Sequence, residues 1–199
     1  MDVVLPIDGS EIPDFQKWVN WNGFRPNHSG IDFAAYLNNR NELIIGLQEG
    51  LPVRAIADGE VQQVIDCYGP YGTTVDIFHG ELNDSADSRY THVVPCVEQG
   101  KKISKGEIIG TLYKDKKIGE QRLVHLHLAL YNSWKIAQSR PFADPEIVFG
   151  AENFIECDSS GSPEPKLIGV ETQPTKIIIA NQNFGSETRV ITPAWKTEN

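Results

Sequence analysis

The chain has 199 residues, of which 40% are hydrophobic and 23% charged, and its formal net charge is −9 at pH 7. This length suits one domain with a substantial core, and the composition is typical of a folded chain rather than a disordered one. The negative charge argues against nucleic acid as a partner, because binding phosphates requires a basic face. No run of about eighteen apolar residues occurs, so the sequence predicts no membrane span.

The N-terminal segment, up to about residue 27, is a polar lead-in that carries several aromatic residues, and we expect these to pack over the body of the domain. Its first residues are neither basic enough nor apolar enough for a signal peptide. Residues 37–50 begin with an Asn-rich run that is typical of a loop. We interpret residues 37–50 as an insertion.

Residues 51–131 have the pattern of short β-strands joined by turns. Apolar residues alternate over positions 53–57, and a turn follows directly. Glycines punctuate short apolar pairs over residues 97–110, as in tight turns between very short strands. Residues 123–131 read as a further apolar strand. Because long helical periodicity is absent, we expect a mainly β fold that closes its edges as a barrel or sandwich.

Residues 151–199 differ in character from the preceding part of the chain. We therefore assign residues 1–150 to one domain and residues 151–199 to a C-terminal extension. A run rich in Ser, Gly and Pro at positions 158–165 is linker-like. Beyond the linker, residues 176–180 and 189–192 could form a β-hairpin.

The sequence lacks several motifs that would point to other chemistries. The three cysteines, Cys67, Cys96 and Cys157, are too few for a disulfide framework, and they contain no CxxC pair for a thiolate zinc site. One bridge with a free thiol and three reduced thiols both remain open. There is no HExxH helix motif, no GxSxG nucleophile turn and no P-loop.

Four of the five histidines fall in three short clusters. The clusters are His28-Ser29-Gly30-Ile31-Asp32, Tyr90-Thr91-His92 and His125-Leu126-His127. Histidine nitrogens and carboxylate oxygens bind zinc at about 2.0–2.2 Å, and three protein ligands with one open position are typical of a catalytic zinc site. The clusters therefore suggest the hypothesis of a zinc hydrolase.

The spacing within the clusters indicates which side chains can meet. In a strand, His125 and His127 share one face with their α-carbons roughly 6.6–6.8 Å apart, so one can bind a metal while the other reaches water or substrate. The alternative is a pair of solvent-facing histidines. A straight strand would hold His28 and Asp32 roughly 13 Å apart, but Gly30 permits a bend that brings them together. The alternative there is a loop with a capping aspartate.

The remaining candidates give weaker signals. His92 could be a ligand, a base beside the metal or a buried core histidine. We interpret His79, before a glycine, as a structural residue at a strand end. Asp58 and Asp76 fit a turn acid and a strand-surface acid better than metal ligands.

Together, the order and setting of these residues resemble the lysostaphin-like zinc endopeptidases, which are peptidase family M23 and are also called LytM domains. The resemblance covers about residues 26–131. The matching segments are residues 28–35, 52–61, 71–80, 89–92, 97–110 and 125–127.

The resemblance implies a zinc ion held by His28, Asp32 and His127, with His92 and His125 assisting a metal-activated water. It implies a small antiparallel β-sheet groove related to the duplicated hybrid motif. The implied substrate is a peptide bond in bacterial peptidoglycan, in a stem or cross-bridge peptide. Such a substrate favours a location in the cell envelope or outside the cell, and the sequence itself leaves a cytoplasmic location open.

Two other hypotheses compete with the peptidase. The first is a non-catalytic binding or regulatory module that retains the zinc site. The second is a carrier or phosphotransfer domain of hybrid-barrel type, because residues 51–64 and 97–112 also resemble such domains. A carrier would need a modified lysine in a Met-Lys-Met turn, but the only methionine is Met1. A phosphotransfer domain would not need Asp32.

Overall fold

The computed structural model describes residues 3–66, 72–82, 85–113, 123–131, 142–158, 165–180 and 189–193. Nearly all of its regular elements are β-strands, which confirms the predicted mainly β class. Within the described ranges, no helix has the length and apolar character needed to cross a membrane. Cys67 and most of the linker-like run, residues 159–164, lie outside the described residues.

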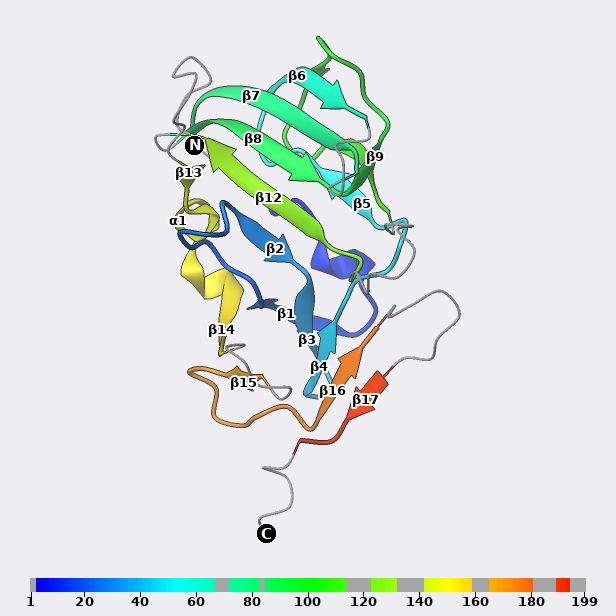
Figure 1. Cartoon of the computed structure of the whole chain (residues 1–199), viewed down its shortest axis with the longest axis vertical. Coiled ribbons are helices and arrows are strands. Elements are labelled where there is room, and N and C mark those ends of the chain that lie inside the picture. Colours follow the sequence, from blue (N-terminus) through cyan, green and yellow to red (C-terminus); the bar gives the residue numbers. More distant parts are fainter. Residues whose placement is uncertain are drawn as a thin grey trace.

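One sheet carries the strands of the predicted site. Its order is β10-β6-β7-β8-β12-β13, and β2 also pairs with β12. The strands are β2 Ile31–Phe33, β6 Gly59–Ile65, β7 Thr74–Leu82, β8 Ser85–Thr91, β10 Lys102–Ile103, β12 Leu126–Tyr131 and β13 Phe142–Ala143. Because His127 pairs with Thr91 on one side and Asp32 on the other, β12 lies between β8 and β2 (Figure 1).

The second sheet combines segments from both ends of the chain, in the order β15-β14-β1-β3-β4-β16-β17. Its strands are β1 Phe15–Asn20, β3 Ala35–Asn38, β4 Glu42–Ile45, β14 Phe154–Asp158, β15 Lys166–Leu167, β16 Lys176–Ile179 and β17 Arg189–Ile191. Strand β14 joins β1 in parallel, β16 joins β4 in parallel, and β16 pairs antiparallel with β17. Residues of the predicted extension therefore complete the sheet that the N-terminal segment begins, while the domain boundary at residue 150 stays a prediction.

The region read as an insertion lies inside this sheet. Residues 37–50 include the end of β3 and the whole of β4, which pair antiparallel across a short turn. The Asn-rich start of the segment supplies that turn: Asn41 has a φ of +56°, a left-handed conformation that Asn tolerates better than most residues.

A small third sheet and a few helical turns complete the described structure. The sheet pairs β11 Ile108–Leu112 with β5 Pro52–Arg54 and β9 Val93–Pro95. The helical elements are the 3-10 turns η1 Gly9–Glu11 and η3 Ala151–Asn153 and the α-helix α1 Pro145–Phe149. The side chain of Asp144 caps α1 by accepting from the amide of Glu146, proline occupies its first turn, and Gly150 ends it.

The main core explains why the site faces the other side of its sheet. In β12, the leucines at alternate positions 126, 128 and 130 are fully buried in the core, so His127 points to the opposite face. In β2, Ile31 and Phe33 enter the same core, which turns Asp32 to the face of His127. Trp18 of the N-terminal segment packs edge-on against Phe33, with ring centroids 5.2 Å apart.

Candidate functional site

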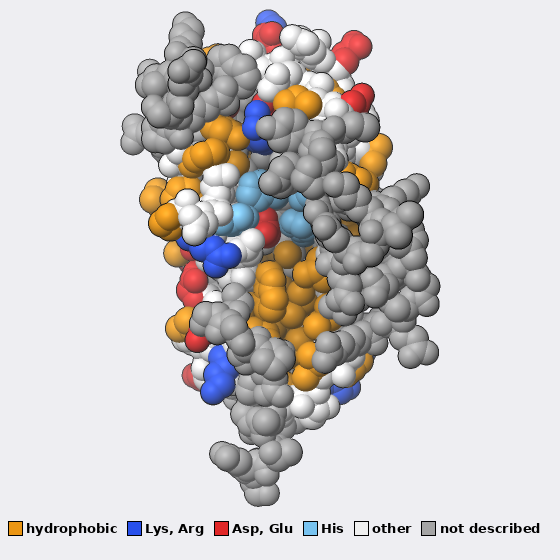
Figure 2. Space-filling model, in the orientation of Figure 1, with side chains coloured by type: hydrophobic (Ala, Val, Ile, Leu, Met, Phe, Trp, Pro, Cys, Tyr) orange, Lys and Arg blue, Asp and Glu red, His pale blue; other side chains and the backbone are white. Residues whose placement is uncertain are grey.

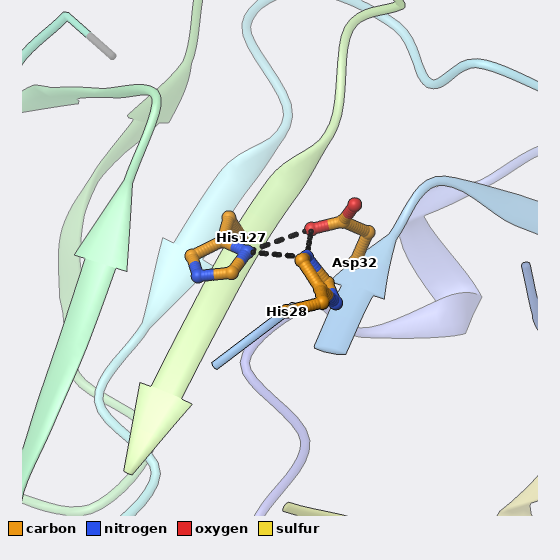
Figure 3. Close-up of side chains that lie close together, drawn as sticks. All are labelled: His28, Asp32 and His127. Atoms are coloured by element: carbon orange, nitrogen blue, oxygen red, sulfur yellow. Dashed lines mark hydrogen bonds and ion pairs between the residues drawn. The ribbon is translucent and has the colours of Figure 1, made fainter. Parts of the chain in front are cut away.

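Three of the predicted residues meet where β2 pairs with β12. Asp32 and His127 are direct cross-strand partners, so the sheet register itself sets their side chains next to each other. His28 reaches them from a tight turn before β2, which two backbone hydrogen bonds with Arg25 close. Figure 3 shows the three side chains pointing toward one another from these two strands and the turn.

The distances among these side chains test whether they fit a metal ion. Asp32 Oδ1 lies 2.8 Å from His127 Nδ1 and 3.2 Å from His28 Nε2, and the two histidine nitrogens are 3.1 Å apart. Ligand atoms about 2.1 Å from a tetrahedral zinc ion would be separated by about 3.4 Å. One carboxylate and two imidazoles at this spacing therefore fit a single zinc ion.

Neighbouring groups fix the orientation of these side chains. His28 Nδ1 donates to the carbonyl of Gly23 at 2.9 Å, which leaves Nε2 facing Asp32. Asn22 Nδ2 donates to Asp32 Oδ2 at 2.5 Å, and Arg25 in turn donates to Asn22 Oδ1 at 2.8 Å. Partners of this kind orient ligands in metal sites. The sequence analysis missed Asn22, whose proximity to His28 in the chain was its only signal.

Asp32 and His28 shift each other's pKa values. Burial alone would raise the pKa of Asp32, but hydrogen bonds from His127 and His28 outweigh burial and hold this pKa well below its usual range. Burial likewise acts to lower the pKa of His28, and the hydrogen bond and charge of Asp32 overcome it and raise that pKa. Asp32 is therefore ionised at neutral pH and supplies a negative ligand.

The other two predicted histidines lie beside this group. The rings of His92 and His125 have centroids 4.5 Å apart. His125 Nδ1 donates to the carbonyl of Leu123 at 2.8 Å, and its Nε2 lies 3.9 Å from Asp32 Oδ1. His92 has a φ of +71°, a left-handed conformation that is uncommon for a residue other than glycine and is found often at functional sites.

All five predicted residues line one cavity of about 460 Å³. The other described residues that line it are Asn22, Asn27, Ser29, Ile65, Thr74, Arg89, Thr91, Tyr131 and Phe142. Figure 2 shows histidine side chains gathered around an acidic one near the middle of this face. The fifth histidine, His79, lies elsewhere: it is buried in β7 and contacts Ser88 Oγ at 2.6 Å through Nε2.

Arg89, which lines the cavity, forms an ion pair that the sequence analysis did not identify. Arg89 donates from Nε and Nη2 to the two carboxylate oxygens of Asp76, at 2.7 and 2.6 Å. The prediction of a strand-surface acid at position 76 is wrong, because Asp76 is buried and accepts a further hydrogen bond from Gln63. Alternation along β8 could have identified Arg89, since it shares a face with Thr91, the strand partner of His127.

Several solved structures are similar to this chain at low identity. Lysostaphin in solution is 19% identical with a TM-score of 0.49, and the match covers 79% of this chain and 58% of that one. A zinc-containing peptidase from Vibrio cholerae is 21% identical with a TM-score of 0.40, covering 63% of this chain and 35% of that one. A catalytic domain of the prophage-encoded M23 protein EnpA from Enterococcus faecalis is 20% identical with a TM-score of 0.45, covering 67% and 91%.

The family itself is shown by a match to the sequence model of peptidase family M23, which spans residues 26–139. No curated protein sequence matches the chain. The match covers more than half of the 199 residues and contains all three histidine clusters, which confirms the resemblance inferred from the sequence. This chain belongs to peptidase family M23.

Proposed function

We propose that this protein is a zinc-dependent endopeptidase that hydrolyses a peptide bond in bacterial peptidoglycan, in a stem or cross-bridge peptide. The observation that carries the proposal is the convergence of His28, Asp32 and His127 beside His92 and His125 in one cavity. Membership of a peptidase family supports hydrolysis as the reaction. Such a substrate implies that the protein works in the cell envelope or outside the cell.

In this proposal, His28, Asp32 and His127 hold the zinc ion. Two neutral imidazoles and one carboxylate are a donor set suited to zinc, and three protein ligands are the number typical of a catalytic site. When bound, zinc supplies Lewis acidity, which lowers the pKa of a water toward about 7 and polarises the scissile carbonyl. Asn22 keeps Asp32 in position through its hydrogen bond to Oδ2.

His92 and His125 then handle protons and developing charge. Because the Leu123 carbonyl accepts from His125 Nδ1, the Nε2 atom of His125 is left to face the cavity and Asp32. An imidazole in this position can take a proton from the attacking water at neutral pH and pass it to the leaving amine. The other imidazole of the pair can donate a hydrogen bond to the oxyanion of the tetrahedral intermediate.

Digestion of purified peptidoglycan tests the proposal. We expect the zinc-loaded wild type to release new amino groups from peptidoglycan, with the cleaved bond identified by mass spectrometry of the fragments. His125→Gln should bind zinc and retain the thermal midpoint of the wild type but release none. Zinc binding without turnover on any peptidoglycan would instead support a non-catalytic module that keeps the metal site.

A further inference from the structure

We propose that Arg89 binds a carboxylate of the substrate and thereby selects peptidoglycan stem peptides over neutral cross-bridges. This inference rests on the proposed function and adds the chemical class of substrate to it. Three observations carry it: the position of Arg89 beside the candidate metal centre, the way in which its side chain is held, and the charges that line the cavity.

The sheet register places Arg89 two residues along β8 from Thr91, the strand partner of His127. On β8 and β12, Thr91 pairs with His127 and Arg89 pairs with Ala129. Residues two apart in a strand share a face and lie roughly 6.6–6.8 Å from each other. Arg89 is therefore on the same face as His127, and the small side chain of Ala129 faces it across the strand pair. A peptide with its scissile bond at the metal centre would bring a neighbouring residue within reach of Arg89.

The guanidinium group is held in a fixed orientation. Asp76 accepts from two of its five N–H donors, and the Asp76 side chain is only 3% exposed. The guanidinium carbon also lies over the ring of Tyr131, 5.2 Å from the ring centroid. The Arg89 side chain is 22% exposed and lines the cavity. A planar cation that is already ordered loses little conformational freedom when it binds a carboxylate. Its binding is therefore stronger than that of a freely moving arginine side chain.

Arg89 supplies the positive charge at this point of the cavity, and its partner Asp76 offsets part of that charge. Among the described residues that line it, Asp32 is the one acid, and two histidines already contact that carboxylate. Arg89 is the one Lys or Arg in the same set. The chain as a whole carries −9 and repels anions at long range, so a local cation is needed to hold an acidic peptide.

A stem peptide with free carboxylates differs in charge from a glycine cross-bridge. A γ-linked D-glutamate in a stem peptide leaves its α-carboxylate free, and a diaminopimelate residue carries a second free carboxylate. A glycine cross-bridge has no carboxylate along its length. Because a hydrogen bond to a charged group is worth enough to change affinity about tenfold or more, Arg89 can distinguish these two kinds of peptide.

The test compares peptides that differ by one charge. The probes are the C-terminally amidated peptide L-Ala-γ-D-Glu-L-Lys-D-Ala, its α-carboxamide counterpart, the matching pair in which meso-diaminopimelate has a free or an amidated carboxylate, and pentaglycine. We expect the wild type to favour the free carboxylate over the amide in at least one pair by about tenfold or more in kcat/KM. Arg89→Gln should abolish that preference and cleave the amide as the wild type does.

Arg54→Gln is the matched control. Arg54 forms a similar ion pair with Glu11, its side chain is 25% exposed, and it does not line the cavity. This variant should keep the wild-type preference. If Arg89→Gln fails to fold because Asp76 loses its partner, the double variant Arg89→Gln/Asp76→Asn removes the unpaired buried charge and takes its place.

Binding to the His125→Gln variant, measured by titration calorimetry with the same peptides, separates this inference from the proposed function. Discrimination in binding that depends on Arg89, without cleavage by the wild type, would support carboxylate recognition and reject the peptidase. The absence of any carboxylate preference in both binding and cleavage would overturn the inference. An Arg89→Gln variant that cleaves and binds both members of each peptide pair equally poorly would also overturn the inference, since that result indicates a purely structural ion pair.

Discussion

Gly30 is the position where one added methyl group should damage both the fold and the metal centre. A Cβ atom at Gly30 would lie 2.2 Å from the carbonyl oxygen of Leu128 and 3.0 Å from Cε1 of His127. A carbon atom normally stays about 3.3 Å or more from a carbonyl oxygen. Gly30→Ala therefore requires the chain at β2 to move about 1 Å away from β12.

This displacement sets the expected losses of stability and of zinc affinity. Forcing an extra methyl group into a packed site typically costs about 1–3 kcal/mol of unfolding free energy. For a chain of this size, that loss lowers the thermal midpoint by roughly 2–12 °C. Metal–ligand distances tolerate only about 0.2 Å, so a shift of Asp32 relative to His127 should weaken zinc binding about 10- to 100-fold.

Two measurements check this prediction. Thermal unfolding of the zinc-free protein gives the change in stability, and competition with a chromophoric chelator gives the change in zinc affinity. Ser29→Ala is the control, because it changes the adjacent residue without adding volume, and it should leave both quantities close to those of the wild type. A Gly30→Ala protein with wild-type stability and zinc affinity would refute the argument from close packing.

Three further substitutions test other parts of the structure. His125→Ala should lower kcat about 10²- to 10⁴-fold while zinc content stays at one ion per chain, and full activity would reject its role. Burial and the charge of Glu156 raise the pKa of Glu146 from 4.5 to about 7, so the folded state holds a proton that the unfolded state releases, and stability falls as pH rises between these values. After allowance for solvent screening, the unfolding free energy of Glu146→Gln should exceed that of the wild type by about 1 kcal/mol at pH 8 but not at pH 4. Urea unfolding that shows the same difference at both pH values would contradict this. Tyr90→Phe should lose about 1–3 kcal/mol in urea unfolding, because the buried amide of Ile56 would lose its acceptor, and unchanged stability would count against that hydrogen bond.

Local patterns in the sequence were sufficient to predict the strand that carries His127. The alternation of leucine with other residues over 126–131 gives one buried face and one site face, and this depends only on the period of a β-strand. The approach of His28 to Asp32 was also predictable in outline. The reason assigned to Gly30 was incomplete, because its φ is not in the left-handed region and the close approach of Leu128 is what requires glycine.

Contacts between distant segments could not be predicted in the same way. The parallel pairs β1–β14 and β4–β16 join residues more than a hundred positions apart, and no local periodicity encodes such a pairing. The burial of Asp76 could not be predicted for the same reason. Its place in an alternating strand suggested solvent exposure, but Asp76 is buried and is held by Arg89 and Gln63 from the two neighbouring strands.

The zinc content of the purified protein, measured by elemental analysis for the wild type beside Asp32→Ala, tests the central claim most directly. Asp32 contacts both His28 and His127, so its removal should eliminate the site without touching the core face of β2. The account predicts about one zinc ion per wild-type chain and none in the variant. A wild type that holds no zinc even after reloading, or a variant that holds as much as the wild type, would contradict it.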